Sequence, residues 1–401
     1  MRLKHIFALT GAVVLCLQWL ALRHCGLNLP APWQPVLPGA AILGAAFLLS
    51  WAAELAQLEI PQALSLACVA LVAVLPEYAV DIYFAWTGGK DPSYVAYAAA
   101  NMTGGNRLLI GAGWFSVVFA YWIKTGRKAI SLEPARRLEL FALIAATLYS
   151  FVIPLKKTLS LFDCLCLLLI FAAYIVRAAR SHMVEPDLEG GPAELLAGFA
   201  AGPRRAATAL LFVLAALTIC KAAGPFAEGL LRAGRQLGVD EFILVQWLAP
   251  LASEAPEFIV AVLFALRGKP GAGIGTLLSS KVNQWTLLVG MLPLAYAVSS
   301  GGPHAMHLDG RQVSELLLTS AQSIFAVILL CDLEFSLRDG AVIFALFLSQ
   351  LVLTGAAVRC GFAGLYLAMS AGLLAGRTSL REGFVAALRE GGRNVFQRRP
   401  S

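Results

Sequence analysis

Long apolar runs recur along the chain from one end to the other, separated by short polar segments. Each run is close to the roughly 20 residues that an α-helix needs to cross a bilayer. Strands of a membrane barrel would alternate apolar and polar residues, so these unbroken runs exclude a β-barrel. The pattern predicts twelve membrane-spanning helices, near 5–23, 38–56, 62–87, 93–122, 137–155, 159–177, 206–231, 241–266, 272–298, 313–331, 339–357 and 361–376.

The composition agrees with an all-α polytopic membrane protein. Of the 401 residues, 59% are hydrophobic and 14% are charged, whereas soluble domains carry about 25% charged residues. A net charge of +7 indicates basic cytoplasmic loops here rather than nucleic-acid binding. We therefore expect an integral protein of the cell (inner) membrane. Its expected partners are membrane lipids and inorganic cations, with no nucleic acid.

The basic residues are distributed unevenly between the two sides of this predicted topology. Of the 31 Lys and Arg residues, 20 fall on the side that carries both termini and eight on the other side. The remaining three, Arg107, Lys221 and Lys281, lie within spans. Because basic loops stay in the cytoplasm, both termini are predicted to be cytoplasmic.

A polar linker, 178–205, divides the chain into two sets of five spans, 38–177 and 206–357. Residues 1–37 add an extra N-terminal helix and loop, which we expect to be retained because no small-x-small cleavage pattern follows it. Residues 358–401 add a short apolar segment, predicted to form a short helix. They also add a basic cytoplasmic tail, expected at the membrane surface.

The two sets contain related sequences. Pro76 to Gly88 reads PEYAVDIYFAWTG and Pro256 to Gly268 reads PEFIVAVLFALRG, with six of thirteen positions identical. These segments belong to the third and the eighth crossing, which run in opposite directions, so the repeats have inverted topology. Proline-interrupted helices at matching positions of inverted repeats point to a substrate site near the midplane.

The Pro-Glu pair has a clear chemical use. Each proline removes one backbone N–H and frees a carbonyl four residues earlier, at Val72 and at Ala252. Glu77 and Glu257 follow at once. Carboxylates and carbonyls together suit Ca²⁺ or Na⁺, and buried membrane carboxylates pair, bind ions or take protons. The alternative is that both glutamates only hydrogen-bond between helices, which the presence of the dipeptide in both halves disfavours.

The next span of each half supplies the other wall of the predicted site. In the first half, Tyr97, Asn101 and Gly104 or Gly105 lie on one stripe. In the second half, Thr276, Ser280 and Asn283 share a face because they are spaced by four and three. Close packing of small residues between helices is the alternative explanation.

These residues carry a resemblance to a known family. LPE followed by ANMTGGN, and SEAPE followed by GTLLSSKVNQ, resemble the two α-repeats of the sodium/calcium exchanger superfamily of cation antiporters. The resemblance covers about 38–177 and 206–357. It implies ten helices in two inverted sets, alternating access, and export of a cation against Na⁺ or H⁺. Carried over by position, it implies that Glu77, Asn101, Ser253 and Glu257 are ion ligands.

The chain also departs from the pattern of that family. A Thr-Ser pair before the first Pro-Glu motif is Ala73-Val74 here, whereas the second half has Ser253-Glu254 and so gains a carboxylate. One register of the second stripe places Thr276 opposite Asn101, and another places Ser280 there.

Two cations, Arg107 and Lys281, fall beside the expected site. Lys281 could neutralise Glu254, replace a bound Na⁺, or exchange protons. Any of these roles bears on the number of ions exchanged.

The sequence thus predicts a secondary active cation antiporter that exchanges Ca²⁺ for Na⁺ or H⁺. It is not expected to be an enzyme, to hold a resident cofactor or to use ATP, since no Walker motif occurs. The alternatives are a monovalent Na⁺/H⁺ antiporter, a non-transporting sensor or scaffold, and an intramembrane enzyme. The predicted metal ligands are Glu77, Glu257 and Asn101, within a wider ion-binding set of Glu77, Asn101, Ser253, Glu254, Glu257, Thr276, Ser280 and Asn283.

Overall fold

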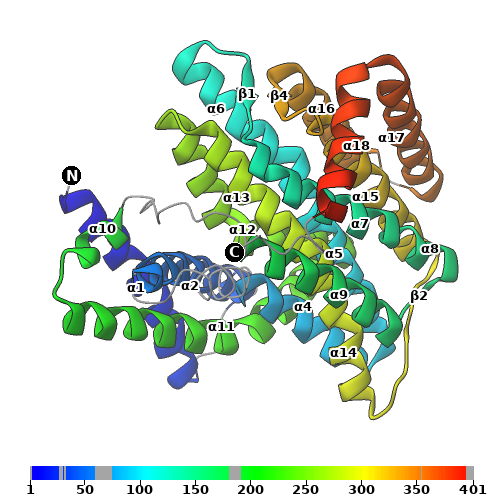
Figure 1. Ribbon diagram of the computed structural model, residues 1–401. Helices are drawn as coiled ribbons and strands as arrows, with labels where there is room; N and C mark the ends of the chain where they lie inside the picture. Colours follow the sequence, from blue (N-terminus) through cyan, green and yellow to red (C-terminus); the bar gives the residue numbers. More distant parts are fainter. Residues whose placement is uncertain are drawn as a thin grey trace.

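The computed structural model describes residues 2–26, 30, 33–58, 75–179, 191–353 and 355–393, and these are mostly helical (Figure 1). Two turns of π-helix, η2 (Leu109–Trp114) and η4 (Gln284–Leu288), join pairs of helices into longer rods. The α-helices are α1 (Arg2–His24), α2 (Trp33–Gln57), α4 (Leu75–Gly88), α5 (Val95–Leu108), α6 (Phe115–Thr125), α7 (Arg137–Ser150), α8 (Val152–Lys156), α9 (Leu161–Ala178), α10 (Pro192–Ala197), α11 (Ala201–Leu237), α12 (Glu241–Leu266), α13 (Pro270–Asn283), α14 (Val289–Ser300), α15 (Gly310–Leu329), α16 (Leu337–Val352), α17 (Ala356–Gly376) and α18 (Thr378–Arg393).

The predicted all-α membrane fold is confirmed. Within the described ranges, nine helical segments are long and apolar enough to cross a membrane. Three of the twelve predicted spans are outside these nine. One is described only from Leu75 onward, one is the rod of α13 and α14, and one is α16, which has 16 residues. The predicted short last span, 361–376, is part of α17, which has 21 residues.

Four short strands show that the repeats are inverted. The loop after α6 carries β1 (Ala129–Ser131), which pairs with β4 (Glu334–Ser336) in the loop after α15. The loop after α8 carries β2 (Thr158–Leu159), which pairs with β3 (Met306–His307) in the loop after α14. The loops after α6 and α14 are equivalent in the two repeats, yet each pairs with the other repeat's next loop. Equivalent loops therefore lie at opposite ends of the bundle.

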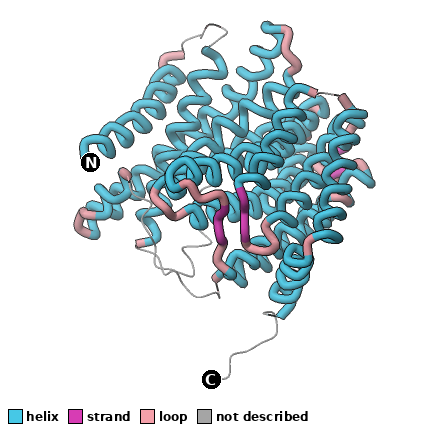
Figure 2. The backbone as a smooth tube through the Cα atoms, turned by 90° about the horizontal axis from the view of Figure 1, so that it is seen from above, coloured by secondary structure: helices cyan, strands magenta, loops and turns pink. Residues whose placement is uncertain are grey.

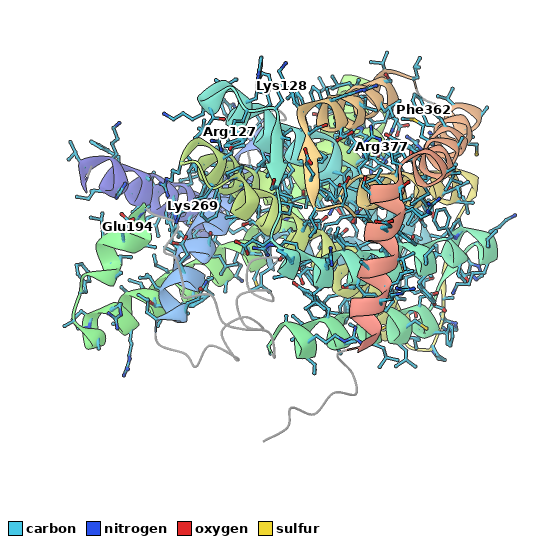
Figure 3. All side chains as sticks on the ribbon, turned by 45° about the horizontal axis from the view of Figure 1, so that its top comes forward. Arg127, Lys128, Glu194, Lys269, Phe362 and Arg377 are labelled. Atoms are coloured by element: carbon cyan, nitrogen blue, oxygen red, sulfur yellow. The ribbon has the colours of Figure 1, made fainter. Side chains whose placement is uncertain are left out.

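Loops that contain basic residues gather at the end marked by β1 and β4. The start of α13 touches β1, since a Cβ on Gly271 would lie 3.4 Å from the Ser131 carbonyl oxygen. The loop before α13 carries Lys269, and the loop before β1 carries Arg127 and Lys128, all labelled in Figure 3. These segments belong to the side that the sequence predicts to be basic.

The centre of the bundle is formed by α5, α12, α13 and α15. Helix α15 is buried along nearly its whole length, and it packs against α5, α7 and α17. Helices α1, α2 and α11 pack against one another at one side of the molecule (Figure 1), and the tube view shows that helices make up most of the described chain (Figure 2). Of the two Pro-Glu helices, α12 belongs to this central group, and α4 packs against its members α5 and α12.

The linker and the tail are more structured than the sequence suggested. Of the predicted linker 178–205, residues 180–190 lie outside the described part, while α10 and the start of α11 are helical. The basic tail forms α18, which buries Leu380 against Ile324 and Ile328 of α15. Gly383 lies so close to Cys331 that a Cβ would be 2.1 Å from its carbonyl oxygen. The described tail is thus docked on the bundle.

Candidate functional site

Carboxylates from the two Pro-Glu helices meet above one glycine. Glu77 in α4 is 4% exposed and Glu254 in α12 is 1% exposed. A Cβ placed on Gly105 would lie 2.5 Å from Glu254 Oε1 and 3.3 Å from Glu77 Oε1. Gly105 thus leaves the space into which a carboxylate from each repeat points.

The neighbouring glycine brings the helix backbones together. A Cβ on Gly104 would lie 1.8 Å from the Gln246 carbonyl oxygen, a distance no side chain permits. Pro250 has no N–H to donate to this carbonyl four residues earlier, so α12 exposes it where α5 makes its closest approach. The Gly104-Gly105 pair therefore allows both the backbone contact and the carboxylate contact.

Glu257 completes a group of three glutamates. Ser280 of α13 donates a hydrogen bond to Glu257 Oε2. Glu257 is within electrostatic range of Glu77 and Glu254, and the three carboxylates repel one another. All three glutamates belong to the predicted ion-binding set, and we call them the carboxylate cluster (Glu77, Glu254 and Glu257).

Many buried polar atoms in and around the carboxylate cluster have no hydrogen bond in the described structure. Leaving one such atom buried and unpaired costs about 1–3 kcal/mol, so protons, cations or water are the partners that the chemistry calls for. These atoms include Glu77 Oε1, both carboxylate oxygens of Glu254 and of Asp81, Asn101 Oδ1, and both side-chain atoms of Gln284.

The structure favours one of the two registers of the second stripe. Ser280 bonds Glu257, whereas Thr276 is partly exposed and donates to the Ala272 carbonyl of its own helix at 3.1 Å. Ser280 follows Asn101 by 179 residues, the same offset that relates LLVG at 287–290 to LLIG at 108–111. The π-turn η4 begins directly after Asn283, and the π-turn η2 begins shortly after Gly105. Turns of π-helix are frequent at functional sites.

Two further predicted ligands, Ser253 and Asn283, are also buried. Ser253 is 7% exposed, and its hydroxyl donates back to the carbonyls of Ala249 at 3.2 Å and Pro250 at 3.3 Å. Asn283 is 3% exposed and lies at the end of α13. The Ala252 carbonyl, which the sequence predicts to be freed by Pro256, lies within the continuous helix α12. The corresponding carbonyl of Val72 and the residues Ala73 and Val74 lie outside the described part of the chain.

The two buried cations have different surroundings. Lys281 Nζ donates to Asn106 Oδ1 at 2.5 Å and lies 4.5 Å from the centre of the Trp285 ring. It forms no direct ion pair with Glu254, although the two attract each other electrostatically. Arg107 instead forms an ion pair with Glu315 of α15 at 2.6 Å. Its charge is therefore paired outside the carboxylate cluster.

Acidic and other metal-binding side chains alone do not form a closed cage. In the described part of the chain, no three His, Cys, Asp or Glu side chains are gathered so that they could hold one metal ion. Oxygens of other kinds would have to take part, and the side-chain oxygens of Asn101 and Gln284 are buried without a hydrogen bond. Ca²⁺ accepts this mixture because it takes six to eight oxygen ligands in flexible geometry.

The sequence reasoning missed Gln284 and Gln246. Gln284 lies beside Glu77 and Glu254, and it is the last residue of the quoted motif GTLLSSKVNQ. Its position opposite the carboxylates depends on the turn at which η4 begins. The backbone carbonyl of Gln246 makes the close contact with Gly104. Pro250, a second proline of α12 that lies one turn before Ser253, could have indicated this contact, because it leaves that carbonyl without its helical hydrogen bond.

Comparisons with known proteins agree with this geometry. The family described as Sodium/calcium exchanger protein matches residues 38–179 and 207–355. The crystal structure of the H⁺/Ca²⁺ exchanger CAX is 43% identical, with a TM-score of 0.93, and covers 97% of this chain and 98% of its own. A search of curated proteins found no match.

Two more distant structures share the fold. Native YfkE is 14% identical, with a TM-score of 0.61, over 89% of this chain and 98% of its own. The sodium-calcium exchanger NCX_Mj is 16% identical, with a TM-score of 0.54, over 86% of this chain and 99% of its own.

Proposed function

Because the chain belongs to the sodium/calcium exchanger family, a family of membrane antiporters, we propose that it exchanges Ca²⁺ for H⁺. The observation that carries this proposal is the carboxylate cluster, in which Glu77 and Glu254 from opposite repeats meet above Gly105. A site built from both repeats opens alternately to each side when the repeats rock against each other.

The charge of the cluster supports a divalent ion. With the neighbouring Asp81 protonated, three ionised glutamates and the ammonium of Lys281 carry two net negative charges, which one Ca²⁺ neutralises. Lys281 is 0% exposed, so its charge acts at low dielectric, where Coulomb interactions are strong. When it is protonated, Lys281 offsets one carboxylate charge, and the charge that remains is the one that a single Ca²⁺ neutralises.

Protons are favoured over Na⁺ as the exchanged ion. When Ca²⁺ leaves, buried carboxylates without hydrogen bonds are costly unless they take up protons. The first repeat lacks the hydroxyl pair of the family pattern, having Ala73-Val74 instead, so it offers fewer neutral ligands for Na⁺. The relative of 43% identity is itself an H⁺/Ca²⁺ exchanger.

We further propose that the protein lies in the cell membrane with both termini in the cytoplasm. The basic loops at the end marked by β1 and β4 support this orientation. To test this, Lys128→Cys and Lys157→Cys, which lie at opposite ends, are each made in a chain whose native cysteines are replaced, since several of these are exposed. Intact cells are then treated with a membrane-impermeant maleimide. Only the variant at Lys157 should react, and selective labelling at Lys128 would reverse the orientation.

The function is tested by imposing gradients one at a time on reconstituted protein. Proteoliposomes with a Ca²⁺ indicator inside are clamped at zero membrane potential and given either an outward H⁺ gradient or an outward Na⁺ gradient. The H⁺ gradient should drive Ca²⁺ uptake, while the Na⁺ gradient should not exceed the rate in protein-free vesicles. Uptake that follows only the Na⁺ gradient would overturn the choice of proton. Ca²⁺ binding without flux under any gradient would indicate a sensor.

A further inference from the structure

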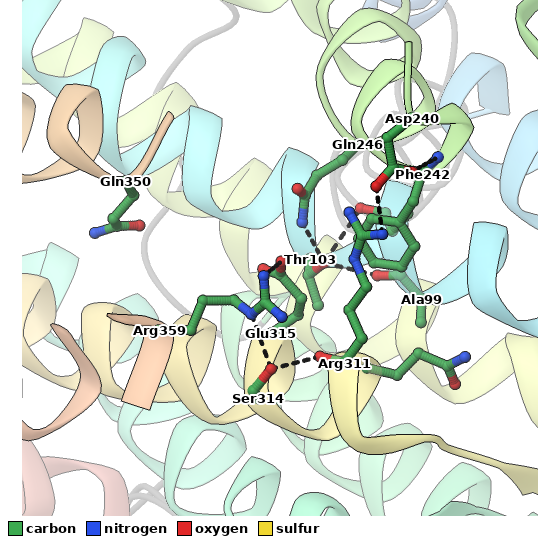
Figure 4. Close-up of polar contacts among 12 residues, drawn as sticks. Ala99, Thr103, Asp240, Phe242, Gln246, Arg311, Ser314, Glu315, Gln350 and Arg359 are labelled. Carbon is green, nitrogen blue, oxygen red and sulfur yellow. Dashed lines mark hydrogen bonds and ion pairs between the residues drawn. The ribbon is translucent and has the colours of Figure 1, made fainter. Parts of the chain in front are cut away.

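A second buried polar cluster lies at the end of the bundle where α12 and α15 begin and α16 ends. Three guanidinium groups, from Arg107, Arg311 and Arg359, line a cavity of about 20 Å³ together with Glu315. Figure 4 shows Arg311 and Arg359 reaching into this region beside Glu315. We call this the arginine pocket (Arg107, Arg311, Glu315 and Arg359).

The arginine pocket carries one positive charge more than its acidic partners balance. Arg311 has a partner of its own, Asp240, at 2.5 Å. Arg107 and Arg359 share Glu315, at 2.6 Å and 3.4 Å. Arg107 is 2% exposed, and an uncompensated charge buried in a membrane protein is costly. One guanidinium charge therefore lacks a counter-charge.

Hydrogen-bond donors in the arginine pocket are also left over. Arg107 Nε and Arg311 Nε are buried and have no hydrogen bond in the described structure. The other groups of Arg107 are engaged, with Glu315 and, at 3.4 Å, with Gln350 Oε1. Arg359 Nε donates to Ser314 Oγ at 2.8 Å. Free N–H donors beside excess positive charge are what an anion requires.

The size of the cavity limits the anion. A cavity needs about 10–15 Å³ to hold one water molecule, and the volume of the arginine pocket, about 20 Å³, is only a little larger. A halide ion matches this small volume and the single uncompensated charge better than a phosphate group or a lipid headgroup does. The walls next to the guanidiniums, such as Trp247 at 5.0 Å from Arg107, favour a weakly hydrated ion.

We propose that the arginine pocket binds one chloride ion, which balances the charge left over by Arg107, Arg359 and Glu315. The chloride is distinct from the exchanged cation, because Arg107 faces Glu315 and Trp247 rather than the carboxylate cluster. Its binding holds α5 of the first repeat to α15 of the second repeat and to α17, which follows that repeat. Chloride then stabilises the folded transporter, and this holds whichever cation the carboxylate cluster takes.

The test measures the thermal stability of the purified full-length protein at constant ionic strength in gluconate, chloride, bromide or phosphate salts. Chloride and bromide should raise Tm by a few degrees over gluconate in a saturable manner, since a ligand of the native state stabilises it. Equal Tm values in chloride and gluconate would overturn the proposal. A rise in phosphate alone would overturn the choice of a halide.

Two substitutions in the arginine pocket should have opposite effects. Arg359→Gln leaves one arginine on Glu315, so the apparent chloride affinity should fall at least about tenfold. Glu315→Gln adds to the excess charge, so Tm should depend more strongly on chloride. Arg338→Gln, at an exposed arginine of α16, is the control and should behave as wild type. An unchanged chloride response in Arg359→Gln would contradict the proposal.

A measurement on the wild-type protein covers the case in which these variants do not fold. Crystals grown in bromide should show an anomalous peak between the guanidiniums of Arg107 and Arg359. Absence of the peak at saturating bromide would contradict the proposal even if Tm responds to chloride.

Discussion

The two repeats provide the same Pro-Glu pair, but they surround it with different side chains. The first repeat supplies Glu77, Asn101 and the Gly104-Gly105 pair, and the two glycines leave space for the approach of α12. The second repeat places Ser280 beside Glu257, and it adds Glu254 and Lys281, which attract each other. The two repeats therefore share the Pro-Glu motif, while the charges around that motif differ. Alternating access needs the symmetry of the backbone, and the asymmetric charges are free to set which ions are exchanged.

The largest expected effect tests the symmetric part of this comparison. Glu77→Gln and Glu257→Gln should each lower H⁺-driven Ca²⁺ flux by about 100-fold or more, because each removes a carboxylate charge from a shared site. Initial rates in proteoliposomes measure this effect. Glu382→Gln, at an exposed carboxylate of α18, should keep the wild-type rate. If only one of the two variants lost activity, the repeats would not share the ion equally.

The next effect concerns the carboxylate that only the second repeat has. Glu254→Gln should weaken the apparent Ca²⁺ affinity about tenfold and lower the H⁺/Ca²⁺ ratio by about one, because binding of a metal displaces protons from its ligands. The ratio follows from the pH gradient at which net Ca²⁺ flux is zero. An unchanged ratio would show that Glu254 does not exchange a proton.

The glycine pair separates stability from binding. A Cβ at Gly104 meets a backbone carbonyl that cannot yield, so Gly104→Ala should cost about 1–3 kcal/mol of stability, measured as a lower Tm. A Cβ at Gly105 meets the end of the Glu254 side chain, which can move. Gly105→Ala should therefore keep Tm near wild type and weaken ⁴⁵Ca²⁺ binding about tenfold. Equal losses of Tm in both variants would argue against this division.

The smallest effect compares the two stripes. Ser280→Ala removes one hydrogen bond to Glu257, worth about 1 kcal/mol, so the apparent Ca²⁺ affinity should fall about fivefold. Asn101→Ala should reduce it by at least as much, because it removes an amide oxygen that is unpaired and available as a ligand. Thr276→Ala is the control, since that hydroxyl bonds its own helix. A loss in Thr276→Ala equal to that in Ser280→Ala would favour the other register.

Much of the fold was predictable from the sequence, because hydrophobic length and the repeated Pro-Glu motif are local signals. The positions of Glu77 and Glu257 in one site followed from the inverted repeat. What the sequence could not reveal were pairings between distant segments. The partner of Arg107, Glu315, lies 208 residues away. Any of several buried carboxylates could have taken that role, and only packing of α5 on α15 decides it.

Close approach of helices was equally hard to foresee. Gly104 and Gly105 were recognised as part of a stripe, yet their separate contacts, with the Gln246 backbone and with Glu254, depend on rotation of α5 against α12. The choice between Thr276 and Ser280 depended on rotation of α13 in the same way. The docking of α18 was missed because a basic amphipathic helix suits a membrane surface as well as a protein groove.

The central claim is that both repeats bind one and the same cation. Crystals of the wild-type protein soaked in Ca²⁺, or in Sr²⁺ for its anomalous signal, test this claim most directly. The account predicts a single peak in the carboxylate cluster, with oxygens of both Glu77 and Glu257 at about 2.3–2.6 Å from Ca²⁺. A peak bound by side chains of one repeat alone, or no peak at concentrations that saturate Ca²⁺ flux, would contradict it.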